Sequence, residues 1–149
     1  PDARILQTHR DPTVVLASFS SMMAHSRGVF TDVVDPDEVA RHWFRKARRM
    51  IARSTAVRAG ASPDSFHDVA YHELVRDPLA VARRVYDFIG LDLHADMLTR
   101  MERWRSANPQ HKHGRHHYRL EDFGLSRSEV TAAFDEYRRR YDIPEEAPR

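Results

Sequence analysis

The chain has 149 residues, of which 41% are hydrophobic and 31% are charged, and this balance predicts a globular protein rather than a disordered segment. A formal net charge of +2 does not favour bulk nucleic-acid binding, and a sequence without cysteine excludes disulfides and thiolate metal sites. No apolar run approaches the roughly 18 residues of a membrane span. No signal peptide is visible either, so we expect a cytoplasmic protein of one domain, residues 1–149, without a transmembrane segment.

The first half of the chain predicts a strand followed by two helices. Residues 3–8 form a short apolar strand, and Asp11 and Pro12 then supply the N-cap and first turn of a helix over residues 13–24. Apolar residues lie nearly all round this helix, so we expect it to be well buried. Residues 25–34 predict a loop, and a second Asp-Pro pair begins a helix over residues 35–59.

The second half predicts one strand and three helices. A strand at residues 66–71 leads through a connection, "HELVRDP", to a helix over residues 78–89 that ends at a glycine. Helices follow at residues 95–107 and 127–141, and the last of these begins with a capping box. Strands that alternate with helices predict an α/β fold, a parallel sheet flanked by helices, with a largely helical C-terminal portion.

A strand that ends on Arg10 directly before a helix start predicts an anion site. Free N–H groups at a helix N-terminus attract anions, and a guanidinium adds a bidentate contact. Ser18 lies eight residues further on, and its hydroxyl could turn back toward the same anion. The alternative is structural: Arg10 pairs with a local carboxylate, and Ser18 fills a helix contact.

Three segments resemble the sulfotransferases that use 3′-phosphoadenosine-5′-phosphosulfate (PAPS). "HRDPTVVLAS" resembles their 3′-phosphate-binding segment, in which an arginine, a proline and a serine recur at the spacing of Arg10, Pro12 and Ser18. "VAYHELVRDPLAVARRVYDFIGL" resembles the strand–loop–helix segment near the adenine, which assigns Tyr71 to that base, although His72 departs from the usual acid. "HKHGRHHYRLEDFGLS" resembles the C-terminal region of bacterial and carbohydrate-type members. The family's basic loop returns there to the 3′-phosphate, and Lys112, Gly114 and Arg115 are the candidates for it.

The resemblance implies the C-terminal portion of a sulfotransferase domain, with a P-loop-NTPase-like fold. On this resemblance, we expect the family's N-terminal phosphosulfate loop and its catalytic base to lie upstream of Pro1. No catalytic residue is therefore assigned, and we expect the chain alone to be incomplete for catalysis. The implied co-substrate is PAPS, with no metal. The acceptor would be a hydroxyl or amine on a small molecule, a carbohydrate or a lipid. An exposed sheet edge also suggests a homo-oligomer.

The residues themselves also suggest other functions. The histidine-rich segment at residues 111–117 could bind a metal, but Lys112 and Arg115 within it would repel a cation. His9 could be a general base, but alternation along the strand points it away from Arg10. A small-molecule kinase would need a Walker loop, which this sequence lacks. A non-catalytic α/β domain that binds a nucleotide or a partner remains the alternative function.

Overall fold

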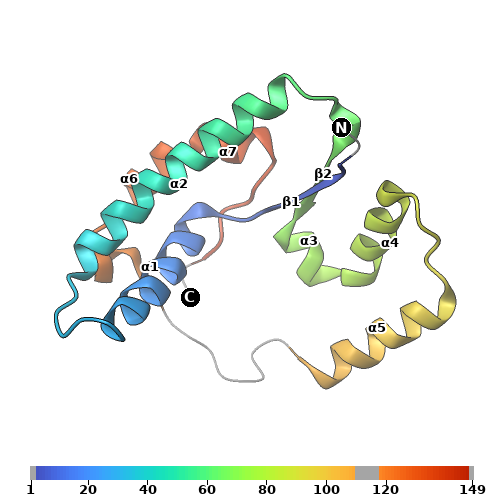
Figure 1. Cartoon of the computed structure of the whole chain (residues 1–149), viewed down its shortest axis with the longest axis horizontal. Helices are drawn as coiled ribbons and strands as arrows, with labels where there is room; N and C mark the ends of the chain where they lie inside the picture. The colour runs from blue at the N-terminus through green and yellow to red at the C-terminus, as the bar shows by residue number, and fades with distance from the viewer. Residues whose placement is uncertain (1–2, 110–117, 148–149) are drawn as a thin grey trace. The chain divides into compact units, whose positions relative to one another are not determined.

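The computed structural model describes residues 3–109 and 118–147 of the chain (Figure 1). These residues form two compact units. The first unit comprises residues 3–9 and 62–109, and the second comprises residues 10–61 and 118–147. The expectation that residues 1–149 are one domain stays a prediction.

A two-stranded parallel sheet organises the first unit. Strand β1 (Ile5–His9) pairs with β2 (Phe66–Ala70), in a register that runs from Ile5 opposite Phe66 to His9 opposite Ala70. The remaining elements of the unit are η1 (Pro63–Ser65), α3 (Tyr71–Arg76), α4 (Pro78–Ile89) and α5 (Ala95–Ala107). The predicted parallel α/β arrangement is confirmed, and so are the helices over 78–89 and 95–107.

The connection predicted after the second strand is wrong. Tyr71 does not end the strand but begins helix α3, and the backbone N–H of Asp77 closes that helix by donating to the carbonyl oxygen of Glu73 over 2.8 Å. Asp77 then caps α4, because its side chain accepts a hydrogen bond from the backbone N–H of Ala80. One short helix therefore runs directly into the next.

Strand β1 leaves apolar side chains exposed. Ile5 and Leu6 are 44% and 45% exposed, whereas parallel strands are usually buried on both faces. This exposed apolar surface supports the prediction that the isolated chain associates, which sedimentation of the purified chain would test.

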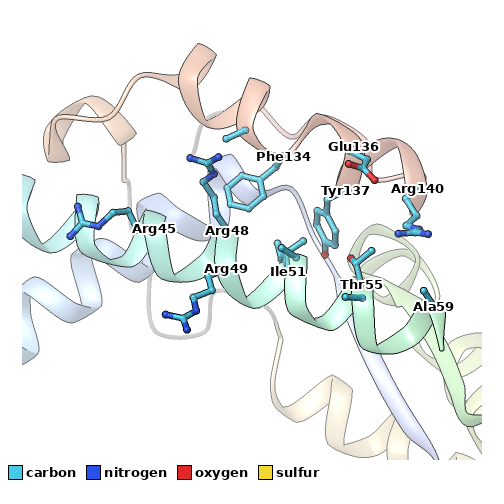
Figure 2. A pocket seen from close by; sticks show the side chains of 13 residues that line it. Arg45, Arg48, Arg49, Ile51, Thr55, Ala59, Phe134, Glu136, Tyr137 and Arg140 are labelled. Carbon is cyan, nitrogen blue, oxygen red and sulfur yellow. The ribbon is translucent and has the colours of Figure 1, made fainter. Parts of the chain in front are cut away.

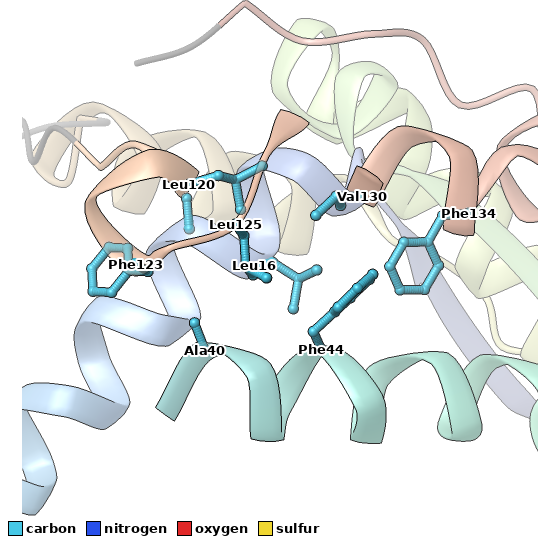
Figure 3. Close-up of a cluster of buried hydrophobic side chains, with 9 residues drawn as sticks. Leu16, Ala40, Phe44, Leu120, Phe123, Leu125, Val130 and Phe134 are labelled. Carbon is cyan, nitrogen blue, oxygen red and sulfur yellow. The ribbon is translucent and has the colours of Figure 1, made fainter. Parts of the chain in front are cut away.

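The second unit is helical and is built around one core. Its elements are α1 (Pro12–Gly28), α2 (Pro36–Ala59), η2 (Leu120–Phe123), α6 (Arg127–Ala133) and α7 (Asp135–Arg140). Figure 3 shows the core side chains of α1, α2, α6 and the segment around η2 pointing toward one another. The buried members are Leu16, Ala17, Ala40, Phe44, Leu120, Phe123, Leu125, Val130 and Phe134. The rings of Phe44 and Phe134 lie 5.9 Å apart between centroids.

Three details of the helical unit differ from the sequence prediction. Helix α1 continues to Gly28, so the predicted loop is shorter than residues 25–34. The same helix is not buried all round, because Val15 and Met22 are 42% and 52% exposed while other apolar residues of α1 face the core. The predicted helix over 127–141 is two helices, since Phe134 leaves helical geometry with ψ near 14° when its ring enters the core.

A glycine closes the turn after η2. Gly124 has a φ of 63°, in the left-handed region that glycine tolerates best. A Cβ added there would also lie 2.5 Å from Cγ of Asp37 on α2. Both the backbone conformation and the close packing therefore favour glycine at this position.

Candidate functional site

Arg10 lies at the junction predicted from the sequence. Strand β1 ends at His9, and α1 begins at Pro12. Asp11 is the N-cap between them, and its Oδ1 accepts a hydrogen bond of 2.9 Å from the backbone N–H of Thr13. The predicted start of the helix and its cap are both confirmed.

Asp11 also ties the C-terminal segment to this junction. The carboxylate is fully buried, and its Oδ2 accepts a hydrogen bond of 2.8 Å from the backbone N–H of Glu146. Arg127 of α6 lies 3.8 Å from the same oxygen, between its Nη2 and Oδ2. A single buried acid thus joins the start of α1 to residues more than a hundred positions away.

The guanidinium of Arg10 binds a carboxylate of the chain itself. Its Nε donates to both carboxylate oxygens of Glu146, at 2.9 and 3.2 Å, and its Nη2 donates to Oε2 at 2.8 Å. The two side chains are 22% and 21% exposed. The ion pair is therefore bidentate and largely removed from water, the stronger kind of such pairs. This is the structural alternative for Arg10, with a partner that is distant in sequence rather than local.

Two hydroxyl side chains of α1 are relevant to an anion at Arg10. Ser18 is half-buried and lies six residues after Pro12, about 9 Å further along the helix axis. Thr13 lies in the first turn and is 2% exposed. Its Oγ1 is buried and has no hydrogen-bond partner among the described residues. The sequence interpretation missed Thr13, although a hydroxyl three residues after the arginine is visible in the sequence.

The remaining predicted binding residues lie elsewhere. Tyr71 is half-buried at the start of α3, in the first unit, whereas Arg10 and Ser18 belong to the second. Lys112, Gly114 and Arg115 lie outside the described residues. Their assignment to a phosphate and an adenine stays a prediction.

His9 has a partner within its own sheet. The ring is 2% exposed, and its Nε2 lies 2.7 Å from Oδ1 of Asp68 on β2. A buried histidine with a carboxylate partner fits the structural role that the sequence favoured over a general base. The sequence did not identify Asp68, because the parallel register that brings β2 beside β1 is a tertiary feature.

A groove lies between α2 and the C-terminal helices (Figure 2). Its volume is about 680 Å³, and its walls include Ile51, Phe134 and Tyr137 together with several arginines. The arginines do not converge on one point. Arg48 extends toward Phe134, whereas Arg49 points to the opposite side of α2. The groove therefore lacks the focused charge of an anion site.

The described residues offer neither a metal-binding cluster nor a membrane-spanning helix. No group of three or more His, Asp or Glu side chains is placed there to hold a metal ion. The histidine-rich segment 111–117 lies outside these residues, so the expectation that no metal is used stays a prediction. No helix in the described part is both long and apolar enough to cross a bilayer.

Comparison with known proteins agrees with the family that the three sequence segments resemble. Residues 1–96 match the model of the sulfotransferase family. The structure is similar to sulfotransferase STF9 from Mycobacterium avium, with a TM-score of 0.87 and 30% sequence identity over 99% of this chain and 38% of that chain. It is also similar to sulfotransferase STF1 from Mycobacterium tuberculosis H37Rv, with a TM-score of 0.70 and 26% identity over 91% of this chain and 34% of that one. No curated protein matches the chain.

These findings show that the chain belongs to the sulfotransferase family. They also confirm the predicted fold, because the described α/β structure superposes on solved sulfotransferases. The chain spans little more than a third of the length of these two relatives.

Proposed function

We propose that this chain is the part of a sulfotransferase that binds the 3′-phosphate of PAPS, the donor of a sulfonate group to a hydroxyl or amine acceptor. The observation that carries the proposal is the position of Arg10, between the carboxyl end of a parallel strand and the first turn of α1. The bidentate contact of its guanidinium with a carboxylate supports it, because a phosphate presents a similar pair of oxygens.

The proposed role of these residues is binding rather than chemistry. Sulfuryl transfer moves a sulfonate group in line from a phosphosulfate anhydride, and adenosine 3′,5′-bisphosphate leaves. By analogy with phosphoryl transfer, positioning and charge neutralisation do most of the work. Arg10 and Ser18 would hold the 3′-phosphate, and Tyr71 would approach the adenine. No catalytic residue is proposed among them.

The loop after α1 is the proposed contact for the acceptor. Val29, Phe30 and Val33 are 70%, 89% and 83% exposed, so the loop presents apolar side chains to solvent. Such a surface favours an acceptor with an apolar body, such as an aryl or alkyl alcohol. Phe30→Ser should weaken the binding of an aryl or alkyl alcohol and leave nucleotide binding unchanged. If the variant and the unmodified chain bind the alcohol equally well, the assignment of this loop to the acceptor is contradicted.

Calorimetric titration tests the nucleotide site. The chain is titrated with adenosine 3′,5′-bisphosphate and, separately, with adenosine 5′-monophosphate. We expect a preference for the bisphosphate that Arg10→Ala removes, at a cost of about 2 kcal/mol, or roughly 30-fold in Kd. This is the low end for a desolvated arginine, because Arg10 is still about a fifth exposed. Arg49→Ala is the matched control, since it removes one arginine that points away from the core on α2.

The other outcomes separate the alternatives. Equal binding of both nucleotides would indicate a general anion site and contradict the assignment of Arg10 to a 3′-phosphate. A folded chain that binds neither nucleotide would favour the alternative, a non-catalytic α/β domain that binds a partner. The same titration on a chain extended at its N-terminus would then show whether further sequence is needed to complete the site.

A further inference from the structure

The carboxylate at Arg10 is held in place by its own anchors. Residues 142–147 follow α7, and we call them the C-terminal strap. Ile143 of the strap is 7% exposed, and its backbone N–H donates to the carbonyl oxygen of Arg138 over 2.9 Å. Glu146 is fixed through its backbone as well, because its N–H donates to Asp11 and its carbonyl oxygen accepts from Nη2 of Arg127 over 2.5 Å. The contact with Arg10 is thus the last of several that dock the strap onto the start of α1.

The charges around Arg10 do not favour a second anion while the strap is docked. Among the described residues, Arg10 pairs with the carboxylate of Glu146, and Arg127 lies beside the carboxylates of Asp11 and Glu145. A phosphate monoester at Arg10 would be repelled by the carboxylate already bound there, strongly so in a site largely removed from water. When the Glu146 carboxylate leaves, the repulsion between it and an incoming anion is removed.

The geometry points to Glu146 as a specificity-determining residue of the Arg10 site, and we infer that its carboxylate competes with the incoming anion for the guanidinium. This inference rests on the proposed function, since it assumes that a phosphate binds at Arg10. A ligand is admitted only if it binds Arg10 more strongly than a carboxylate does. A phosphate monoester, which carries nearly two negative charges at neutral pH, meets that condition, whereas a carboxylate or another monoanion does not.

Glu146→Gln tests the competition directly. The amide keeps the size of the side chain and removes its charge. We expect adenosine 3′,5′-bisphosphate to bind Glu146→Gln at least five times more tightly than the unmodified chain, and Arg10→Ala to abolish the gain in the double variant. Glu145→Gln is the matched control, because it removes the same charge from the neighbouring residue, which pairs with Arg127 instead. We expect it to change the Kd less than twofold.

A second variant keeps the inference testable if Glu146→Gln does not fold. Glu146→Asp keeps the charge but shortens its reach by one methylene, so we expect a gain smaller than that of Glu146→Gln. Far-UV circular dichroism of each variant shows whether the chain is folded. If Glu146→Gln does not fold, an unchanged Kd in Glu146→Asp overturns the inference.

The outcomes separate the inference from the proposed function. If the unmodified chain prefers the bisphosphate through Arg10, but Glu146→Gln binds it equally or more weakly, the function stands and the competition is overturned. Glu146 would then orient Arg10 instead of blocking it. If the unmodified chain shows no preference between the nucleotides, the function fails, and inorganic phosphate is used as the probe. If Glu146→Gln binds phosphate more tightly than the unmodified chain, and Arg10→Ala removes this gain, the competition is still supported. If Glu146→Gln shows no gain in phosphate affinity, the competition is overturned.

Discussion

Asp11 is the residue whose replacement most directly tests how the candidate site is held together. It is fully buried and accepts two hydrogen bonds, one from the first turn of α1 and one from the strap. Asparagine caps a helix as well as aspartate does, so Asp11→Asn should keep the bond from Thr13. Its amide nitrogen would face the backbone N–H of Glu146, donor against donor. Losing this bond to a charged acceptor should cost about 2 kcal/mol.

Asp11→Ala removes the cap as well. A lost N-cap adds about 1 kcal/mol, for a combined cost of about 3 kcal/mol. For a chain of this length, each kcal/mol lowers Tm by roughly 3 °C, so we expect shifts of about 6 °C for Asp11→Asn and about 9 °C for Asp11→Ala. The difference between the two variants isolates the cap, and the effect of Asp11→Asn alone isolates the attachment of the strap.

Tryptophan fluorescence is a suitable assay, during heating for Tm and during urea denaturation for the free energy of unfolding, because the two units each contain one tryptophan. Trp104, in the first unit, is 69% exposed, and Trp104→Phe leaves Trp43 to report on the unit that contains Asp11. Stability of Asp11→Asn equal to that of the parent chain would refute the role given to the bond from Glu146. Equal stability of the asparagine and alanine variants would refute the role given to the cap.

Three further predictions concern the fold and its charges. Gly90→Ala should cost about 1 kcal/mol in urea denaturation, because the position has positive φ. Gly124→Ala should cost more, because its φ is also positive and its Cβ would lie 2.5 Å from Cγ of Asp37, whereas a Cβ at Gly90 would lie 3.7 Å from Nη1 of Arg4; equal costs would contradict the close contact with Asp37. Phe134→Ala should cost about 3–5 kcal/mol, since the ring is 2% exposed in the core, and a loss below about 1 kcal/mol would contradict its place there. The pKa of His42 lies below 6.5, first because the ring is desolvated and second because the charge of Lys46 is close to it. Lys46→Met should therefore raise the pKa of His42 in an NMR titration, and an unchanged pKa would contradict the effect of the charge. Because the folded chain then binds fewer protons than the unfolded chain, the contribution of His42 to stability is full above pH 6.5 and is lost as the pH falls through its folded pKa.

Local signals in the sequence located most of the helices. Three Asp-Pro pairs mark the starts of α1, α2 and α4, and in each the aspartate side chain caps the helix, as predicted for Asp11. Gly90 ends α4 in the left-handed conformation that glycine favours. Caps and stops depend on the few residues around them, so the sequence contains nearly all the information that they need.

Local signals in the sequence did not predict other parts of the fold. Helix α3 and the interruption at Phe134 were missed. Phe134 leaves helical geometry where its ring enters the core, and no local signal marks that position. Val15 and Met22 have the hydrophobicity of core residues and are nonetheless exposed, since only contacts with other elements decide which side of α1 is covered. Hydrophobic pattern predicts that a helix exists more securely than it predicts its buried face.

The sequence by itself determined the family and the order of strand and helix at Arg10, and it predicted an anion site there. Only the tertiary structure decided which anion the chain supplies there, the carboxylate of Glu146, which is 136 positions away in sequence. It likewise decided that His9 pairs with Asp68. The physical reason is common to both pairs. A cap or a turn is fixed by neighbours in the chain, whereas a long-range ion pair forms only after the docking of strands and helices has brought its two charges together and removed them from water.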